Sequence, residues 1–193
     1  MVDLQACVLC GGSSRRMGRD KALIAHPRGG CWLTRSVDLC QKQGLSVHVV
    51  SPHLSHHKLV STIEGVIACS EPLRGRGPLA ALASVFGVSN AKALLVMPVD
   101  MPWLESETLV QLIQMWSEHP SMALVSHDGS RHQPLFAVYP NESVYRATMS
   151  SQLISNELSM FSWLCKVPYQ TLVFPEARLR NVNYPEDWEQ LEE

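Results

Sequence analysis

The sequence predicts a single α/β domain over residues 1–193, with three layers in a Rossmann-like arrangement and a mostly parallel central sheet. Two observations lead to this fold class. Short apolar runs alternate with segments whose apolar residues recur at helical spacing, which is typical of repeated strand–helix units. The most continuous apolar run, residues 93–98, suits a central parallel strand that is buried on both faces. A chain of 193 residues is also long enough to bury a sizeable core.

Each strand of this fold is predicted from an apolar run that ends in turn-forming residues. These runs cover residues 6–9, 46–51, 65–69, 93–98, 122–126, 135–139 and 169–174. Apolar residues at helical spacing predict helices over residues 32–40, 79–86, 109–116 and 142–166, with a further helix at the C-terminus. We expect Gly44 to end the first helix, Pro78 to begin the second and Ser106 to cap the third.

The composition is that of a soluble globular protein, with 46% hydrophobic and 18% charged residues. The formal net charge of −2 provides no basic field that would favour nucleic acid. The first five residues lack the basic and apolar pattern of a signal peptide, and no apolar run approaches the ~20 residues that span a bilayer. We therefore expect a cytoplasmic protein without nucleic-acid or membrane partners.

Six cysteines and a histidine cluster raise the question of a metal or redox site. Cys7 and Cys10 form a Cys-x-x-Cys, but on a strand their side chains point to opposite faces, and no second pair completes a zinc site. His53, His56 and His57 have no carboxylate or cysteine beside them in the sequence. A solvated loop or short helix is therefore favoured over a metal site, and we expect the cysteines to be core thiols.

A glycine-rich, basic loop follows the first strand. The stretch from Leu9 to Lys21 contains two glycines directly after Cys10, followed by two serines, three arginines and the lysine. Bare backbone N–H groups and cations at the end of a strand are typical of a phosphate-binding loop. The spacing excludes a Walker A loop, because five residues separate Gly12 from Gly18 and Arg19 follows. The Gly-x-Gly-x-x-Gly of dinucleotide-binding proteins is also missing from the start of this loop.

Two further strand ends carry residues that suit a nucleotide site. Asp100 follows the strand at residues 93–98, and ligands of open α/β sheets bind outside the carboxyl ends of the strands. A carboxylate there, beside a phosphate-binding loop, is a natural Mg²⁺ ligand. The third strand leads to a second glycine-rich turn over residues 75–79, where small residues allow the start of a helix to approach a flat ligand closely.

Polar residues later in the chain are candidates for contacting a second substrate. An Asp-Gly pair at residues 128–129 predicts a hairpin turn, but this turn does not explain the Arg131, His132 and Gln133 that follow. These three side chains bring a cation, donors and acceptors to one loop, so we interpret them as contacts for a polar second substrate.

An Asn-Val-Asn segment near the C-terminus is a further candidate. Asn181 and Asn183 alternate along an extended segment, so their amides point to the same side. Spacing alone leaves open whether these amides face solvent, a phosphate or a metal-bound water.

Together these motifs resemble those of the molybdenum cofactor guanylyltransferases, which are nucleotidyltransferases with a fold of the nucleotide-diphospho-sugar transferase type. The resemblance extends over nearly the whole chain. It is carried by Leu9-Cys10-Gly11-Gly12, Arg16-Met17-Gly18, Asp20-Lys21, Gly77-Pro78-Leu79-Ala80, Asp100-Met101-Pro102, His127-Asp128-Gly129 and Asn181-Val182-Asn183-Tyr184-Pro185. Many nucleotidyltransferases share the first block, whereas the last four segments together are more specific to this family.

The resemblance implies a reaction in which GTP and molybdopterin, already carrying molybdenum, form the guanine dinucleotide cofactor and pyrophosphate with Mg²⁺. It also implies transient contacts with molybdenum-insertion proteins and apo-molybdoenzymes. A CTP-dependent cytidylyltransferase is an alternative, although such proteins usually have Ala-Gly after the first strand and Asp-Gln-Pro where this chain has Asp100-Met101-Pro102. A sugar-phosphate nucleotidyltransferase is usually longer. A non-catalytic carrier of nucleotide or cofactor is disfavoured because Lys21 and Asp100 are retained.

The roles implied by the resemblance fall into three groups. The nucleotide would be bound by Leu9, Cys10, Gly11, Gly12, Lys21, Ser51, Glu71, Gly77, Pro78, Leu79 and Asp100. The catalytic groups would be Lys21, Arg16 and Asp100, with Asp100 as the Mg²⁺ ligand. Asn181 and Asn183 would lie near the molybdopterin phosphate. Three positions depart from the family's pattern: Cys10 replaces the usual Ala, Glu71 the usual Asp, and Ser51 a frequent Asn.

Overall fold

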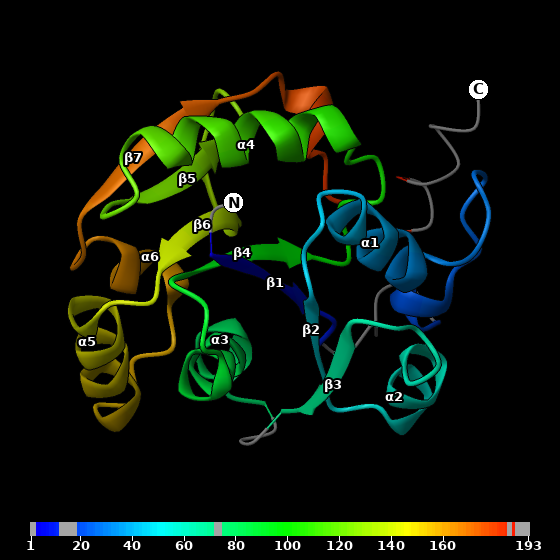
Figure 1. Cartoon of the computed structure of the whole chain (residues 1–193), viewed down its shortest axis with the longest axis horizontal. Coiled ribbons are helices and arrows are strands. Elements are labelled where there is room, and N and C mark those ends of the chain that lie inside the picture. The colour runs from blue at the N-terminus through cyan, green and yellow to red at the C-terminus, as the bar shows by residue number, and fades with distance from the viewer. Residues whose placement is uncertain (1–2, 12–18, 72–74, 185–186, 188–193) are drawn as a thin grey trace.

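The computed structural model describes residues 3–11, 19–71, 75–184 and 187, which build a seven-stranded sheet in the order β3-β2-β1-β4-β6-β5-β7 (Figure 1). Apolar and β-branched residues dominate the central strands, which suits a buried pleated surface. The strands are β1 Leu4–Leu9, β2 Val47–Ser51, β3 Val66–Ser70, β4 Ala93–Pro98, β5 Ala123–His127, β6 His132–Pro140 and β7 Tyr169–Val173. All seven predicted strands are therefore confirmed, with shifts of a few residues at their ends.

The sheet is mostly parallel, as predicted. β1 pairs in parallel with β2 and β4, β2 with β3, and β5 with β7. Only β6 runs the other way among the described strands, because it pairs antiparallel with both β4 and β5. The central strand β4 is buried along its whole length. However, one of its two neighbours is antiparallel, a detail that its apolar run does not specify.

Helices cover both faces of the sheet and complete the three predicted layers (Figure 1). They are α1 Trp32–Gln41, α2 Leu54–Val60, α3 Gly77–Val88, α4 Ser106–Glu118, α5 Ser143–Ile154 and α6 Met160–Leu164, with 3₁₀ turns η1 Lys21–Leu23 and η2 Glu176–Leu179. Apolar residues of α1 and α4 pack in one buried cluster, and those of α3, α5 and α6 pack in a second cluster. No helix within the described ranges is long and apolar enough to cross a membrane.

Alternation along β1 divides its side chains between the two clusters. Ala6 and Val8 belong to the cluster on the α1 and α4 side, whereas Cys7 and Leu9 belong to the cluster on the α3 side. Cys10 lies in the first cluster, so Cys7 and Cys10 point to opposite faces as predicted. The described cysteines are all free thiols.

Two predicted helix details are wrong, and a third lies outside the described residues. Ser106 does not cap α4: Glu105 occupies the cap position, and the Ser106 hydroxyl lies 2.6 Å from Gln43 Nε2, from which it accepts a hydrogen bond. The predicted helix over residues 142–166 is interrupted, because Asn156 has a left-handed φ of 59° and Ser159 begins α6 by accepting a hydrogen bond from a backbone N–H. The predicted C-terminal helix falls mostly on residues that the structure does not describe.

Candidate active site

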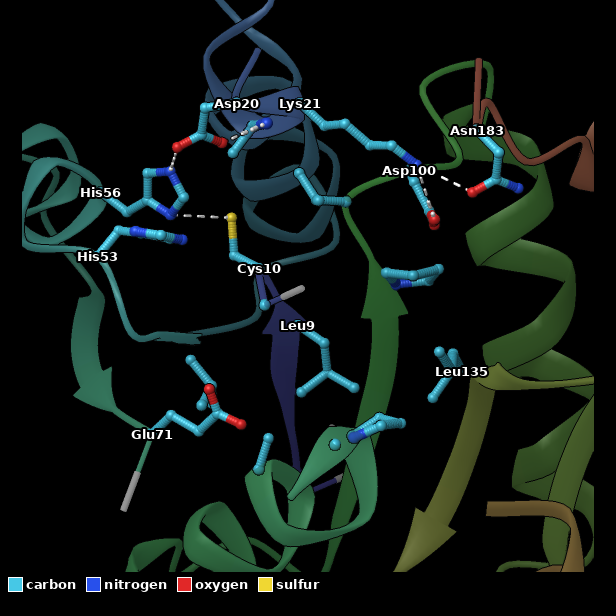
Figure 2. A pocket seen from close by; sticks show the side chains of 18 residues that line it. Leu9, Cys10, Asp20, Lys21, His53, His56, Glu71, Asp100, Leu135 and Asn183 are labelled. Carbon is cyan, nitrogen blue, oxygen red and sulfur yellow. Dashed lines mark hydrogen bonds and ion pairs between the residues drawn. The ribbon is translucent and has the colours of Figure 1, made fainter. Parts of the chain in front are cut away.

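A pocket of about 320 Å³ lies at the carboxyl ends of β1 and β4 (Figure 2). The chain adds β2 and β3 on one side of β1 and then crosses to β4 on the other side. The pocket is therefore at the point where the strand order reverses, which is where open α/β sheets bind ligands. The predicted site residues that line it are Leu9, Cys10, Gly11, Lys21, Glu71, Gly77, Pro78, Asp100 and Asn183.

Several other predicted site residues do not line this pocket. Ser51 and Leu79 are fully buried, and the Ser51 hydroxyl is bonded to His56 Nδ1 at 2.7 Å. Asn181 is partly buried and outside the lining. Gly12 and Arg16 lie outside the described residues, so their predicted roles stay predictions.

The turn into α3 forms one wall of the pocket. Gly77 begins the helix with a φ of 74°, a backbone conformation in which any residue with a side chain would be strained. Pro78 follows within the first turn, as predicted. Gly11, which also lines the pocket, is different, because its φ is not in the left-handed region and an added Cβ would meet nothing closer than 3.9 Å. The fold itself therefore does not require glycine at position 11, whereas a ligand that approaches the backbone closely would.

Lys21 and Asp100 face each other across the upper part of the pocket (Figure 2). Lys21 Nζ lies 3.7 Å from Asp100 Oδ2, and the two side chains are 15% and 31% exposed. Burial raises the pKa of Asp100 above its usual range, and the Lys21 ammonium offsets this rise only in part. The carboxylate is therefore short of favourable partners, which is typical of a functional group rather than of a stabilising ion pair.

The C-terminal segment contacts the same ammonium group of Lys21. Lys21 Nζ donates to the Val182 carbonyl at 2.8 Å and to Asn183 Oδ1 at 2.9 Å. The Val182 N–H in turn donates to the Asp100 carbonyl at 2.9 Å. Segments that are far apart in the chain thus meet at the predicted phosphate-binding lysine. Asn183 lines the pocket and is held there by its hydrogen bond to this lysine.

Among the polar residues that line the pocket, sequence reasoning missed Asp20, His53 and His56 as site residues. His56 was expected in a solvated loop or short helix, but α2 buries it to 1% exposure. Its Nε2 lies 2.8 Å from Asp20 Oδ2. The available signal was Asp20 itself, a carboxylate that precedes the predicted phosphate-binding lysine and that needs a partner when it is partly buried.

The loop between β5 and β6 is organised by Asp128. Its Oδ1 accepts hydrogen bonds from the Ser130 and Arg131 backbone N–H groups, and its Oδ2 accepts one from Gln133 Nε2 at 2.6 Å. The predicted hairpin turn is confirmed, and Asp128 explains the orientation of Gln133. His132 packs edge-on against Tyr169, 5.6 Å away between ring centroids. None of residues 131–133 is among the residues that line the pocket, so their contact with a second substrate stays a prediction.

Asp20, Glu71 and Asp100 supply the carboxylates of the described lining, and Asp100 is the one paired with the Lys21 ammonium. Within the described residues, no group of three His, Cys, Asp or Glu side chains could hold a metal ion. Asp100 alone would supply one oxygen ligand, whereas Mg²⁺ takes six oxygens and is commonly bound through one or two carboxylates together with phosphates and water. The described lining therefore fits a cation that enters with a phosphate ligand.

The chain matches a known sequence family, and curated relatives match it over nearly their full length. Residues 6–159 match the MobA-like NTP transferase domain. A protein from Rhodopirellula baltica named "Probable molybdenum cofactor guanylyltransferase" is 32% identical over 194 residues, which are 95% of this chain and 89% of the relative. A protein of the same name from a Geobacillus species is 30% identical over 99% of both chains.

Solved structures share the fold at lower identity. Molybdopterin-guanine dinucleotide biosynthesis protein A from Archaeoglobus fulgidus matches with a TM-score of 0.75 at 18% identity, over 96% of this chain and 95% of that one. CMP:2-keto-3-deoxy-manno-octonic acid synthetase, solved with CTP, matches with a TM-score of 0.75 at 13% identity, over 97% and 96% of the two chains. The predicted nucleotide-diphospho-sugar transferase type of fold is thus confirmed.

Proposed function

The chain belongs to the MobA-like NTP transferase family, as a relative of its molybdenum cofactor guanylyltransferases, and we propose that it transfers GMP from GTP to molybdopterin. The products are the molybdopterin guanine dinucleotide and pyrophosphate. The observation that carries the proposal is the pocket at the strand-order reversal. Its lining includes Gly11, where no side chain separates the backbone from a ligand, and the Lys21–Asp100 pair at its upper end. An NTP has a matching shape, with a flat base at one end and phosphates at the other.

The chemistry needs positioning and charge rather than a proton acceptor. A terminal oxygen of the molybdopterin phosphate attacks the α-phosphorus of GTP, a new P–O bond forms, and the bond to the β-phosphate bridging oxygen breaks. The nucleophile is already an anion at neutral pH, so no general base is required. The protein must hold two anions together and offset the charge that grows on pyrophosphate. Lys21 supplies a cation for this purpose, and Arg16 is a second candidate.

Asp100 is the residue that would hold Mg²⁺. Its carboxylate is partly buried, and Lys21 offsets only part of the energetic cost of desolvating it. A divalent cation bound there would offset the rest by electrostatic attraction. When it is bound, Mg²⁺ neutralises phosphate oxygens and so stabilises the charge on the leaving group. We propose that the nucleotide phosphates complete the metal's ligands, because Asp100 alone is a poor Mg²⁺ site.

Nucleotide selection is assigned to the lower part of the pocket. Leu9, Cys10 and Gly11 after β1 line the pocket together with Gly77 and Pro78 at the start of α3. Glu71 lies beside this space, and its carboxylate can accept hydrogen bonds from the guanine edge. Polar groups that pair with one base edge are left unpaired by another base, which makes rejection strong.

The second substrate is assigned to the edge of the sheet next to Asp100. The loop with Arg131, His132 and Gln133 follows β5, whose carboxyl end is at the same edge as that of β4. Asn183 lines the pocket at this side, and Asn181 precedes it in the same segment. We propose that these amides and the loop contact the molybdopterin, and that molybdenum-insertion proteins and apo-molybdoenzymes approach from this edge.

A nucleotide panel tests the function. The protein is incubated with Mg²⁺, molybdopterin and GTP, CTP or ATP in turn, and the dinucleotide and pyrophosphate are measured. We expect GTP to be used well ahead of CTP and ATP, and Lys21→Ala to serve as the inactive control. Equal or faster use of CTP would make the protein a cytidylyltransferase, and nucleotide binding without pyrophosphate release would make it a carrier.

A further inference from the structure

His56 connects three elements at the edge of the pocket (Figure 2). It is 1% exposed, yet each ring nitrogen has a polar partner. Nδ1 lies 2.7 Å from Ser51 Oγ at the end of β2 and 3.4 Å from Cys10 Sγ at the end of β1. Nε2 lies 2.8 Å from Asp20 Oδ2, in the residue before η1. A buried histidine with both nitrogens satisfied is held in one orientation.

The surrounding hydrogen bonds assign the proton on the ring. Ser51 Oγ accepts a hydrogen bond from the His53 backbone N–H at 3.1 Å, so its own hydrogen is free to be donated to His56 Nδ1. The Asp20 carboxylate can only accept, so Nε2 is the ring nitrogen that must carry a hydrogen. His56 therefore donates from Nε2 to the Asp20 carboxylate.

Asp20 links His56 to the 3₁₀ turn that begins at Lys21. While Oδ2 accepts from His56, Oδ1 accepts from the Ala22 backbone N–H at 3.1 Å and caps the 3₁₀ turn that Lys21 begins. The orientation of the Asp20 carboxylate thus sets the start of the turn from which the Lys21 side chain reaches the pocket. A reactive group must be held within about 0.5 Å of its working position, and supporting hydrogen bonds provide this precision.

We propose that His56 is a positioning residue, which fixes Asp20 through Nε2 and thereby aims Lys21 at the phosphates of the nucleotide. This role rests on the proposed function, in which Lys21 contacts those phosphates. Cys10 and Ser51, two of the positions that depart from the family's usual residues, both contact His56. Their side chains therefore serve the orientation of this histidine, and neither side chain needs to touch the nucleotide.

The same residues do not form a hydrolytic triad, although Ser51, His56 and Asp20 are of the right types. Ser51 is 0% exposed, and its hydroxyl is occupied by His56 and by the His53 backbone, so it cannot attack a substrate. In a nucleophilic triad, the serine bonds to Nε2 and the aspartate to Nδ1, which is the reverse of the arrangement here. The cluster holds a loop in place and performs no covalent step.

Two substitutions of His56 test the contacts of its two ring nitrogens separately. His56→Gln carries an amide near the former Nε2 and can still donate to Asp20, whereas His56→Asn carries one near the former Nδ1 and cannot reach Asp20. Both side chains are neutral, polar and smaller than histidine. His57→Asn is the matched control, because His57 lies in the same helix and bonds to the Ser51 carbonyl rather than to Asp20.

The first readout is the reactivity of Lys21 toward acetic anhydride, measured by mass spectrometry relative to Lys166 in the free protein. We expect His56→Asn to raise Lys21 labelling on the order of tenfold, while His56→Gln and His57→Asn stay within about twofold of the parent. The second readout is GMP transfer. We expect kcat to fall about 10- to 100-fold in His56→Asn and much less in His56→Gln, since small displacements of an aligned group have effects of this size.

The outcomes distinguish this role from packing and from the proposed function. Equal labelling of Lys21 in the Gln and Asn variants, or a similar rise in His57→Asn, would mean that His56 only supports the helix, and the positioning role would be wrong. The labelling pattern described above, in a protein that transfers no GMP, would support the positioning of Lys21 and overturn the proposed reaction. Transfer by the parent protein with unchanged kcat in His56→Asn would overturn the positioning role alone.

Discussion

Asp100→Asn should lower turnover strongly while leaving the free energy of unfolding unchanged or slightly increased. The substitution keeps the shape of the side chain and removes its charge. At the 3.7 Å separation between Lys21 Nζ and Asp100 Oδ2, two unit charges near a protein surface attract by about 4 kcal/mol before desolvation is counted. Burial nevertheless raises the pKa of Asp100, so desolvation exceeds all the favourable contacts of the carboxylate. Lys21 also keeps Val182 and Asn183 as partners when the charge is removed.

The effect on stability follows from the sign of this pKa shift. A carboxyl whose folded pKa is raised contributes stability below its unfolded pKa, and that contribution is lost as pH rises through the folded pKa. At pH 7 the ionised Asp100 therefore destabilises the fold. We expect Asp100→Asn to leave the free energy of unfolding unchanged or to increase it by up to about 1 kcal/mol at pH 7, with the difference disappearing below the usual aspartate value of 3.8.

Turnover should change far more than stability. Removal of one preorganised electrostatic group costs about 10²- to 10³-fold in kcat, or about 2.7–4 kcal/mol. The assay measures GMP transfer by Asp100→Asn across a Mg²⁺ titration, with GTP binding in parallel. Urea denaturation at pH 7 and below pH 3.8 is the control for folding. Near-normal turnover at ordinary Mg²⁺ concentrations, or a loss of stability greater than about 1 kcal/mol, would show that Asp100 is a structural residue.

Two further predictions concern charged groups at the same edge of the sheet. Lys21→Ala should lose at least about 10²-fold in turnover. The fold should survive with a lower urea midpoint, because Asp100, the Val182 carbonyl and Asn183 lose a partner. Wild-type turnover in this variant would remove its phosphate role. Burial raises the pKa of Asp128, but hydrogen bonds from Arg131, Ser130 and Gln133 outweigh this and lower it to about 2. The contribution of Asp128 to stability is therefore present above pH 4 and lost as pH falls toward 2. Asp128→Asn should cost about 1 to 2 kcal/mol at pH 7 by urea denaturation, allowing for screening by solvent, and equal stabilities at pH 7 would contradict this assignment.

The order of strands and helices could be predicted from the sequence because it depends on local patterns. Alternating apolar runs and helical spacing identified each strand of the sheet, and the glycine-rich loop before Lys21 identified the phosphate-binding end. Asp100 was found for the same reason, since a polar residue directly after a buried strand must lie at the carboxyl edge of the sheet. Chain direction alone placed these two residues at the same edge of the sheet, and the pairing of β1 with β4 brings them close together.

The tertiary structure decided which side chains meet at that edge. Asn183 reaches Lys21 across 162 residues of sequence, and no local spacing specifies such a contact. The reversed direction of β6 arises from its pairing with both β4 and β5, and an apolar run is compatible with either direction. His56 looked like a solvated residue because its partners Asp20 and Cys10 are distant in sequence, and it becomes buried only when α2 packs on β2 and β3. Burial requires a polar group to find partners, and those partners are chosen by the packing of the whole sheet.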